Sequence, residues 1–250
     1  MLISLVVGRG SLVILTPKVT LLAQTVFNST EAFEITGGIW RRENGSTTGQ
    51  SLAEFAGRAC YESWNRPNPK TAKNADYIRH IIEVGHWSVL EHASFTVHIE
   101  GVSRSLTHEL VRHRHFSYSQ LSQRYVDESS ADYVVPPAIN SDHDPKRREA
   151  ALAILAAAHQ ATRSWYKVLV DMYGEDRSRK RAREVARAVL PNMTETKIIV
   201  TGNFRAWAHF FDLRMSDGAD REIYELAKRL YAIGVLLAPE IFPEEKLKLI

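Results

Sequence analysis

Helical periodicity marks the first well-patterned segment of the chain, between Leu52 and Cys60. Apolar residues recur there three and four positions apart, which places Leu52, Phe55, Ala56, Ala59 and Cys60 on one side of a helix. Cys60 is therefore expected on the buried face of this helix. A free cysteine is usually a small core residue, so we do not expect Cys60 to act as a nucleophile.

The same kind of pattern predicts six further helices and two strands. Helices are expected at about 72–84 (ended by Gly85), from Val102 to about 112, at 147–172, at 177–190 (ended by Pro191), at 203–214, and from Ile223 to Leu237 before Pro239. Strands are expected at 94–100 and 196–201, where β-branched and aromatic residues dominate. Loops are expected at 37–50, 64–71 and 136–149.

These elements are expected to form one domain of the α+β class. The chain shows no internal repeat, low-complexity tract or convincing linker, so we expect a single domain over residues 1–250. The apolar stretch 1–15 is interpreted as an initial strand or an N-terminal extension. It lacks a basic n-region, and Gly8-Arg9-Gly10 interrupts its apolar run, so it does not resemble a signal sequence.

Composition narrows the function classes. Of the 250 residues, 44% are hydrophobic, which excludes a largely disordered chain, and the net charge of +3 is too small for wholesale binding to nucleic acid or a membrane surface. No apolar run reaches the length of about 18 residues that a membrane span requires. Cys60 is the only cysteine, so no intrachain disulfide can form and a cytoplasmic location is expected.

Positive charge is concentrated instead in one stretch, RHRHFSYSQLSQRY, which runs from Arg112 to Tyr125. On the helix that leads into it, Arg104, His108 and Arg112 are spaced by four residues and share one face, which His115 continues if the helix persists. Such a row either binds an anion or is a solvated surface.

The residues that follow favour the anion-binding interpretation. Segment 117–123 is rich in hydroxyls and amides, which serve as both donors and acceptors toward a heterocyclic base. Arg124 comes next, and a guanidinium matches phosphate oxygens with two parallel hydrogen bonds. This stretch therefore predicts a nucleotide ligand, which has both a base and a phosphate.

Other arginines admit two interpretations. The run RSRKRAREVAR at 177–187 is typical of a solvated amphipathic helix with Val185, Ala186 and Val189 turned inward, but a nucleic-acid-binding module built from the two basic helices stays open. Arg187 lies beside that apolar face and is expected to point toward a pocket. Arg214 ends a mostly apolar helix, where an unpaired guanidinium is costly, so Arg214 requires an anionic partner.

A metal site is not expected, although seven of the ten histidines lie between His80 and His115. The pattern HELVRH separates its histidines by five positions, whereas two zinc ligands on one helix face need a separation of four. Arg112 and Arg114 would also repel a cation.

The motif that decides among these alternatives is Arg112-His113-Arg114 followed, after seven residues, by Ser122. It resembles the signature of the flavin-dependent thymidylate synthases. The segments EFAGRACYESW, NPKTA, HIIEVGHWSVLEHASF, SRSLTHELVRHRHFSYSQLSQRY, ARAVLPNMTET and TGNFRAW...LRMS resemble, in order, those of actinobacterial members. The resemblance covers roughly residues 50 to 237.

This resemblance implies a fold and a reaction. The fold is the family's own α/β type, with a central antiparallel or mixed sheet, long helices and no Rossmann motif, assembled as a homotetramer whose active sites lie at subunit interfaces. The reaction methylates dUMP to dTMP, with 5,10-methylenetetrahydrofolate as carbon donor, a tightly bound FAD as hydride carrier, and NADPH to recharge the flavin.

The resemblance also assigns roles to residues. Those expected to contact the FAD cofactor or lie beside it are His86, Ser88, Arg112, His113, Arg114, Gln120, Asn203, Phe204, Arg205 and His209. Those expected to surround dUMP are Glu109, Arg112, Gln120, Leu121, Ser122, Gln123, Arg124, Arg187 and Arg214.

Two of these assignments carry the chemistry. Arg214 is the expected catalytic residue, because a nucleophilic uracil C5 requires negative charge to develop over N3 and its neighbouring oxygens. Ser122 is expected to bind and orient dUMP rather than attack it, because no base that could activate its hydroxyl is assignable from the sequence.

Overall fold

The computed structural model describes residues 16–65, 68–175 and 178–248, and in addition the backbone pairing of residues 5–6 with 11–12. Its strands are β1 (Leu5–Val6), β2 (Ser11–Leu12), β3 (Lys18–Gln24), β4 (Ser94–Ser103), β5 (Ser117–Gln120) and β6 (Glu195–Asn203). Its α-helices are α1 (Ser29–Ile35), α2 (Thr48–Ala59), α3 (Asn74–Glu83), α4 (Arg104–Leu110), α5 (Pro137–Asn140), α6 (Pro145–Gly174), α7 (Arg179–Ala186), α8 (Phe204–Arg214), α9 (Arg221–Leu237) and α10 (Glu245–Lys248). Three short 3-10 helices complete it: η1 (Pro69–Thr71), η2 (Trp87–Glu91) and η3 (Arg187–Val189).

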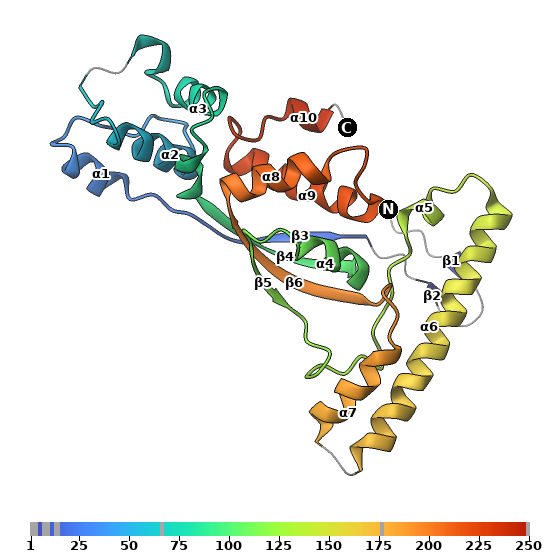
Figure 1. Ribbon diagram of the computed structural model, residues 1–250. Coiled ribbons are helices and arrows are strands. Elements are labelled where there is room, and N and C mark those ends of the chain that lie inside the picture. Colours follow the sequence, from blue (N-terminus) through green and yellow to red (C-terminus); the bar gives the residue numbers. More distant parts are fainter. Residues whose placement is uncertain (1–4, 7–10, 13–15, 66–67, 176–177, 249–250) are drawn as a thin grey trace.

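A four-stranded antiparallel sheet forms the centre of the fold, with the strand order β3-β4-β6-β5. Figure 1 shows α1, α2 and α3 at one end of the molecule, α8 and α9 over the sheet, and α6 with α7 projecting at the other end. The α+β class predicted from the sequence is confirmed. The short pair β1 and β2 lies apart from this sheet, and the rest of the predicted initial strand at 1–15 lies outside the described residues.

One face of the sheet is apolar and covered, and the other is polar and partly exposed. Phe95, Val97 and Ile99 of β4 point into the core, where α4, α8 and α9 pack on them. Trp207 of α8 stacks on Phe95 with ring centroids 4.6 Å apart. The opposite face carries Thr96, whose hydroxyl lies 2.9 Å from another hydroxyl on β6. This alternation is the strand pattern expected at 94–100.

Local signals explain where the predicted helices begin and end. The side chain of Asn203 accepts a hydrogen bond from Ala206 N (2.8 Å), which caps the start of α8. Gly85 has a φ of +76°, a left-handed conformation that glycine adopts without strain, and it ends the helix expected at 72–84. Asp144 caps α6 ahead of Pro145.

The helix expected from Val102 to about 112 is shorter than predicted. Val102 and Ser103 still belong to β4, and α4 ends at Leu110, so Arg112 and His115 do not continue the face of Arg104 and His108. Tyr118 is one reason for the early end: its Oη lies 2.6 Å from Leu110 O and 2.8 Å from His113 O. The chain turns here and enters β5.

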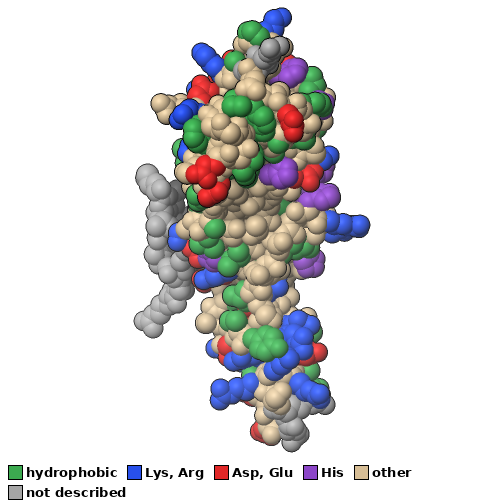
Figure 2. Space-filling view, turned by 90° about the vertical axis from the view of Figure 1, so that its left-hand side faces the viewer, with side chains coloured by type: hydrophobic (Ala, Val, Ile, Leu, Met, Phe, Trp, Pro, Cys, Tyr) green, Lys and Arg blue, Asp and Glu red, His purple; other side chains and the backbone are tan. Residues whose placement is uncertain are grey.

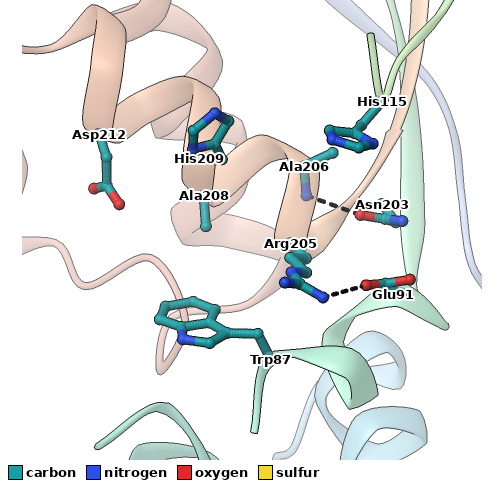
Figure 3. A pocket seen from close by; sticks show the side chains of 9 residues that line it. All are labelled: Trp87, Glu91, His115, Asn203, Arg205, Ala206, Ala208, His209 and Asp212. Atoms are coloured by element: carbon teal, nitrogen blue, oxygen red, sulfur yellow. Dashed lines mark hydrogen bonds and ion pairs between the residues drawn. The ribbon is translucent and has the colours of Figure 1, made fainter. Parts of the chain in front are cut away.

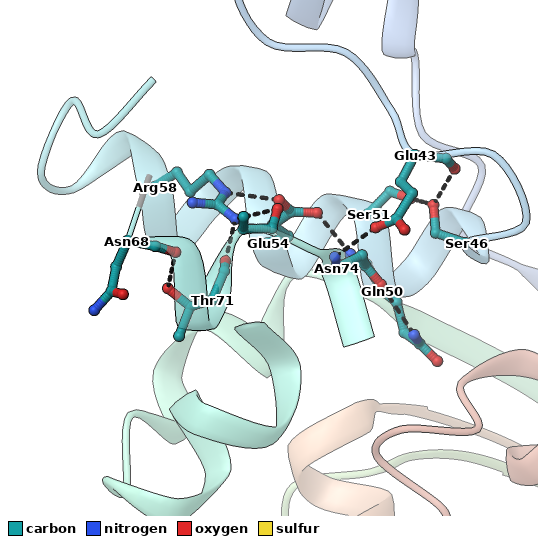
Figure 4. A network of polar contacts seen from close by, with 10 residues as sticks. Glu43, Ser46, Gln50, Ser51, Glu54, Arg58, Asn68, Thr71 and Asn74 are labelled. Atoms are coloured by element: carbon teal, nitrogen blue, oxygen red, sulfur yellow. Dashed lines mark hydrogen bonds and ion pairs between the residues drawn. The ribbon is translucent and has the colours of Figure 1, made fainter. Parts of the chain in front are cut away.

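The prediction that Cys60 is buried was wrong, since its side chain is exposed at the end of α2. The buried face of α2 carries a polar network instead (Figure 4). Arg58 Nε donates to Glu54 Oε1 (2.6 Å), and Asn74 Nδ2 donates to Glu54 Oε2 (2.7 Å). Arg58 Nη2 donates to Thr71 O (2.7 Å), so the network joins α2 to η1 and α3.

Further differences concern short elements. The loop expected at 136–149 contains α5, and α2 begins inside the loop expected at 37–50. The basic helix expected at 177–190 is α7 followed by η3, with residue 177 outside the described residues. Elements α1, β3 and β5 were not predicted. Among the described residues, no helix is long and apolar enough to cross a membrane.

Candidate active site

The guanidinium of Arg214 is the centre of the candidate site. Its Nη1 donates to Glu109 Oε2 (2.8 Å), and its Nε donates to His113 Nε2 (2.9 Å). The anionic partner that Arg214 requires is therefore Glu109, from α4. Within the described part of the chain, Arg214 Nη2 makes no hydrogen bond, so one edge of a fixed guanidinium stays available to a ligand.

His113 is held in its neutral form. Burial, the positive charge of Arg214 and the neighbouring His209 together lower the pKa of His113 to about 4. An acceptor at Nε2 is what a neutral imidazole offers to Arg214, and its ring also packs edge-on against Phe210 with centroids 4.9 Å apart. The arrangement is therefore stable only while His113 is unprotonated.

We expect this to appear in the pH dependence of stability. Because the folded pKa of His113 lies below the unfolded value, His113 contributes a fall in the free energy of unfolding as pH decreases from about 6.5 toward 4. In His113→Gln this fall should be smaller, whereas His143→Gln, at an exposed histidine before α6, should leave it unchanged. Urea unfolding at a series of pH values measures this, and an equal slope in both variants would contradict it.

Helix α4, which carries Glu109, is fixed at its start by a carboxylate from α9. Ser103 N donates to Glu222 Oε1 (2.8 Å) and Ser103 Oγ donates to Glu222 Oε2 (2.7 Å). Ser103 Oγ in turn accepts from Leu106 N (3.0 Å) and so caps the helix. Burial raises the pKa of Glu222. These contacts hold Glu109 toward Arg214.

Two adjoining cavities lie beside this group. The first, of about 530 Å³, is shown in Figure 3 and is lined by Trp87, Glu91, His115, Asn203, Arg205, Ala206, Ala208, His209 and Asp212. The second, of about 330 Å³, is lined by Arg112, His113, Arg114, His115, Phe116, Ala206, His209, Leu213 and Arg214. They share His115, Ala206 and His209. An exposed ion pair joins Arg205 to Glu91 at 2.6 Å in the first cavity.

A separate group of predicted residues lies near α7. Arg124 Nε is 3.3 Å from Glu184 Oε2, and both line a third cavity of about 440 Å³. Figure 2 shows lysine and arginine side chains gathered at the lower end of the molecule, where α7 lies. Arg187 is exposed at the start of η3.

The structure thus divides the predicted site residues into groups. Glu109, Arg112, His113, Arg114, Asn203, Arg205, His209 and Arg214 line or adjoin the first two cavities. Leu121, Ser122, Gln123 and Arg124 follow β5, whose last residue is Gln120. Arg187 comes directly after α7, the helix whose Glu184 contacts Arg124. His86 and Ser88 are exposed at η2, and Phe204 is buried with its N–H bonded to Ala93 O (2.9 Å).

Some residues of the first cavity were not predicted. Trp87 stands between His86 and Ser88, so its position in the sequence was a usable signal. Asp212 had a usable signal as well, because it lies one turn beyond His209 on the same helix. Glu91 had none, because its contact with Arg205 depends on the fold. Among the described residues, no cluster of three metal-binding side chains is present.

The fold is of the α+β class, and guanidinium and imidazole groups line its two adjoining cavities. The profile of the family described as thymidylate synthase complementing protein matches residues 45–240. The chain belongs to that family.

Individual relatives agree with this assignment. The chain is 50% identical to a flavin-dependent thymidylate synthase of Mycolicibacterium gilvum, over 91% of this chain and 89% of that protein. It is 55% identical to the enzyme of that name from Mycobacterium avium, over 78% of this chain and 79% of that protein. The flavin-dependent thymidylate synthase of Mycobacterium tuberculosis is 53% identical over the same shares.

Proposed function

We propose that this chain is a flavin-dependent thymidylate synthase that methylates dUMP to dTMP, with 5,10-methylenetetrahydrofolate as carbon donor, FAD as flavin and NADPH as the source of reducing equivalents. The relatives named above support the activity. The structural observation that carries the proposal is the guanidinium of Arg214, which Glu109 and His113 hold at two nitrogens beside a cavity.

Arg214 performs the central electrostatic task. Making C5 of uracil nucleophilic builds negative charge over N3 and its neighbouring carbonyl oxygens, and C5 then uses this electron density to form the new carbon–carbon bond. A guanidinium already held in place stabilises that charge without having to reorganise during the reaction. Glu109 and neutral His113 fix its orientation, and Arg214 Nη2 remains to face the pyrimidine.

The residues of the two adjoining cavities fit a flavin. Arg112, Arg114 and Arg205 supply guanidinium groups for a pyrophosphate, and Asn203 and His209 supply polar contacts at the wall. Trp87 offers an aromatic surface to a planar ring. When bound there, the reduced flavin supplies a hydride for the methyl group, while these side chains hold it in position.

Arg124 and Arg187 are assigned to the phosphate of dUMP, and Ser122 to orienting the nucleotide. Within one chain the contacts of Arg124 lie at α7, whereas those of Arg214 lie at α4. We therefore assign Arg124 and Arg187 of one copy and Arg214 of a second copy to one shared site. A homotetramer with sites between its subunits fits this division.

The long helix α6 supports association of copies. Ile154, Trp165, Val168 and Met172 are all exposed on it, and only Leu152 and Tyr166 of its 30 residues are buried. Large apolar side chains that are exposed together mark an interaction surface. Coverage by a second copy of the chain accounts for the exposure of these side chains in a single copy.

Release of tritium from dUMP labelled at C5 tests the function. Release should require the folate and a reduced flavin, and the purified protein should be yellow and lose FAD on denaturation. A colourless protein without tritium release would favour the alternative of a nucleic-acid-binding module. The relatives give that alternative no support, and part of the basic charge at α7 is already paired, as in Arg183 with Asp127 at 3.6 Å.

Arg124→Ala tests the phosphate contact. We expect the variant to bind dUMP more weakly by about 1.5–3 kcal/mol, the range for a hydrogen bond to a charged group. Isothermal titration with dUMP measures the change. Arg229→Ala, at an exposed arginine of α9, is the control and should bind dUMP as the unsubstituted protein does. An unchanged affinity in Arg124→Ala would contradict the phosphate contact.

A further inference from the structure

Two buried threonine hydroxyls hold the side-chain amide of Gln120. Gln120 is the last residue of β5 and lies on the sheet face that α4 covers. Its Nε2 is 3.0 Å from Thr107 Oγ1 and 3.4 Å from Thr196 Oγ1. Thr107 and Thr196 are 1% and 0% exposed, so water does not compete for these contacts.

The contacts of Thr107 determine which way the amide points. Thr107 Oγ1 donates its single proton to Arg104 O, 2.9 Å away. Toward Gln120 it can therefore act only as an acceptor, and only the Nε2 end of the amide is a donor. The orientation of an amide follows from such a network. Gln120 Nε2 is thus directed at Thr107, and Oε1 is directed away from it.

The first turn of α4 also fixes the backbone next to Gln120. Arg104 Nη2 donates to Leu121 O (2.7 Å), and Leu121 N donates to Lys197 O (2.9 Å) of β6. Both the side chain of Gln120 and the peptide that follows it are therefore held by α4 and β6. The amide cannot easily turn to present its other end.

Within the described residues, Gln120 Oε1 accepts no hydrogen bond. A carbonyl oxygen fixed in this way recognises a donor and repels another acceptor. A uracil ring and an isoalloxazine ring both carry an imide, an N–H between two carbonyl groups. Cytosine presents a bare acceptor nitrogen at the same position, so this oxygen discriminates against it.

We propose that Thr107 is a positioning residue that locks Gln120 as an acceptor for an imide N–H, which selects an imide ring over a cytosine-type ring. The proposal rests on the proposed function, together with the family resemblance that assigns Gln120 to both dUMP and FAD. It adds that Gln120 is the acceptor in that contact and that Thr107 fixes the amide in this orientation.

Thr107→Val tests the lock, because valine keeps the shape and removes the hydroxyl. Dissociation constants for dUMP, dCMP and FAD are measured. If the imide is that of uracil, dUMP should bind about tenfold more weakly and its preference over dCMP should fall about tenfold. If the imide is that of the flavin, FAD should bind about tenfold more weakly with the dUMP preference unchanged. Thr107→Ser, which restores the hydroxyl, should rescue either loss.

The control is Thr162→Val on α6, where the threonine hydroxyl also donates to its own helix, at Ala158 O (2.8 Å). It should change none of the three constants. Thr196→Val provides a second variant if Thr107→Val does not fold, with an expected loss of a few fold in the same direction. In a folded variant, an equal loss of affinity for dUMP and dCMP overturns the proposal. Unchanged affinities for both dUMP and FAD overturn it as well. A native protein that binds neither dUMP nor FAD would instead refute the proposed function.

Discussion

Arg214→Ala should lower turnover by roughly a hundredfold to a thousandfold while the protein keeps its flavin. This range is typical for removal of one fixed donor that stabilises developing charge. The contacts of Arg214 to Glu109 and His113 are internal to the protein. Its free edge is assigned to the pyrimidine, so flavin binding is expected to persist without it. Single-turnover tritium release and the flavin absorbance after gel filtration measure the two effects.

Arg214→Lys is the second variant to measure at this position. Lysine keeps a positive charge but cannot bond Glu109 and His113 with the fixed geometry of a guanidinium, so it should recover only a small part of the lost rate. Arg221→Ala, at an exposed arginine of α9, should turn over normally. A yellow Arg214→Ala protein with nearly native turnover would show that the charge at the pyrimidine is stabilised elsewhere.

Arg58→Met should lower the free energy of unfolding by about 3–5 kcal/mol, because removal of one partner of a buried ion pair leaves an uncompensated charge. The side chains of Arg58 and Glu54 are only 5% and 7% exposed. Arg58 also bonds the carbonyl oxygen of Thr71, so the variant leaves that group without its partner. Urea denaturation monitored by circular dichroism gives the change.

The chain offers a matched control for this prediction. Arg221 and Glu225 form an ion pair at the same spacing of four residues, but their side chains are 59% and 35% exposed. Arg221→Met should therefore cost less than about 1 kcal/mol. Similar losses in the two variants would mean that burial of the Arg58 pair does not govern its contribution to stability.

The sequence predicted the elements whose patterns are set locally. α3, α8 and α9 have clear helical periodicity and recognisable ends, such as Gly85 after α3, and β4 alternates between its two faces. β5 was not predicted, because residues 117–120 are polar and become a strand only through pairing with β6. Tertiary contacts decide the structure of such a segment.

The prediction that Cys60 is buried was wrong for a similar reason. The apolar side of α2 suggested an inward face, but Glu54 and Arg58 occupy the interior instead because each satisfies the other and Asn74 completes the network. A pattern of hydrophobicity along one helix does not reveal a partner on another element.

At the site, the sequence indicated what Arg214 needs but not which residue provides it. Glu109 is 105 positions away, and only the folded chain brings it to the end of α8, where Arg214 lies. The neutral state of His113 likewise follows from burial and from Arg214, neither of which the motif displays. The roles of Arg124 and Arg187 stay predictions, because their contacts within one chain lie at α7.

Co-expression of an Arg124→Ala chain with an Arg214→Ala chain tests the shared site most directly. If each site takes Arg124 from one copy and Arg214 from another, mixed oligomers contain some sites with both arginines intact. At dUMP well below saturation, the mixture should then recover about a quarter of the native activity, far above either variant alone. Activity no higher than the mean of the two separate variants would show that both arginines act within one chain or in different sites.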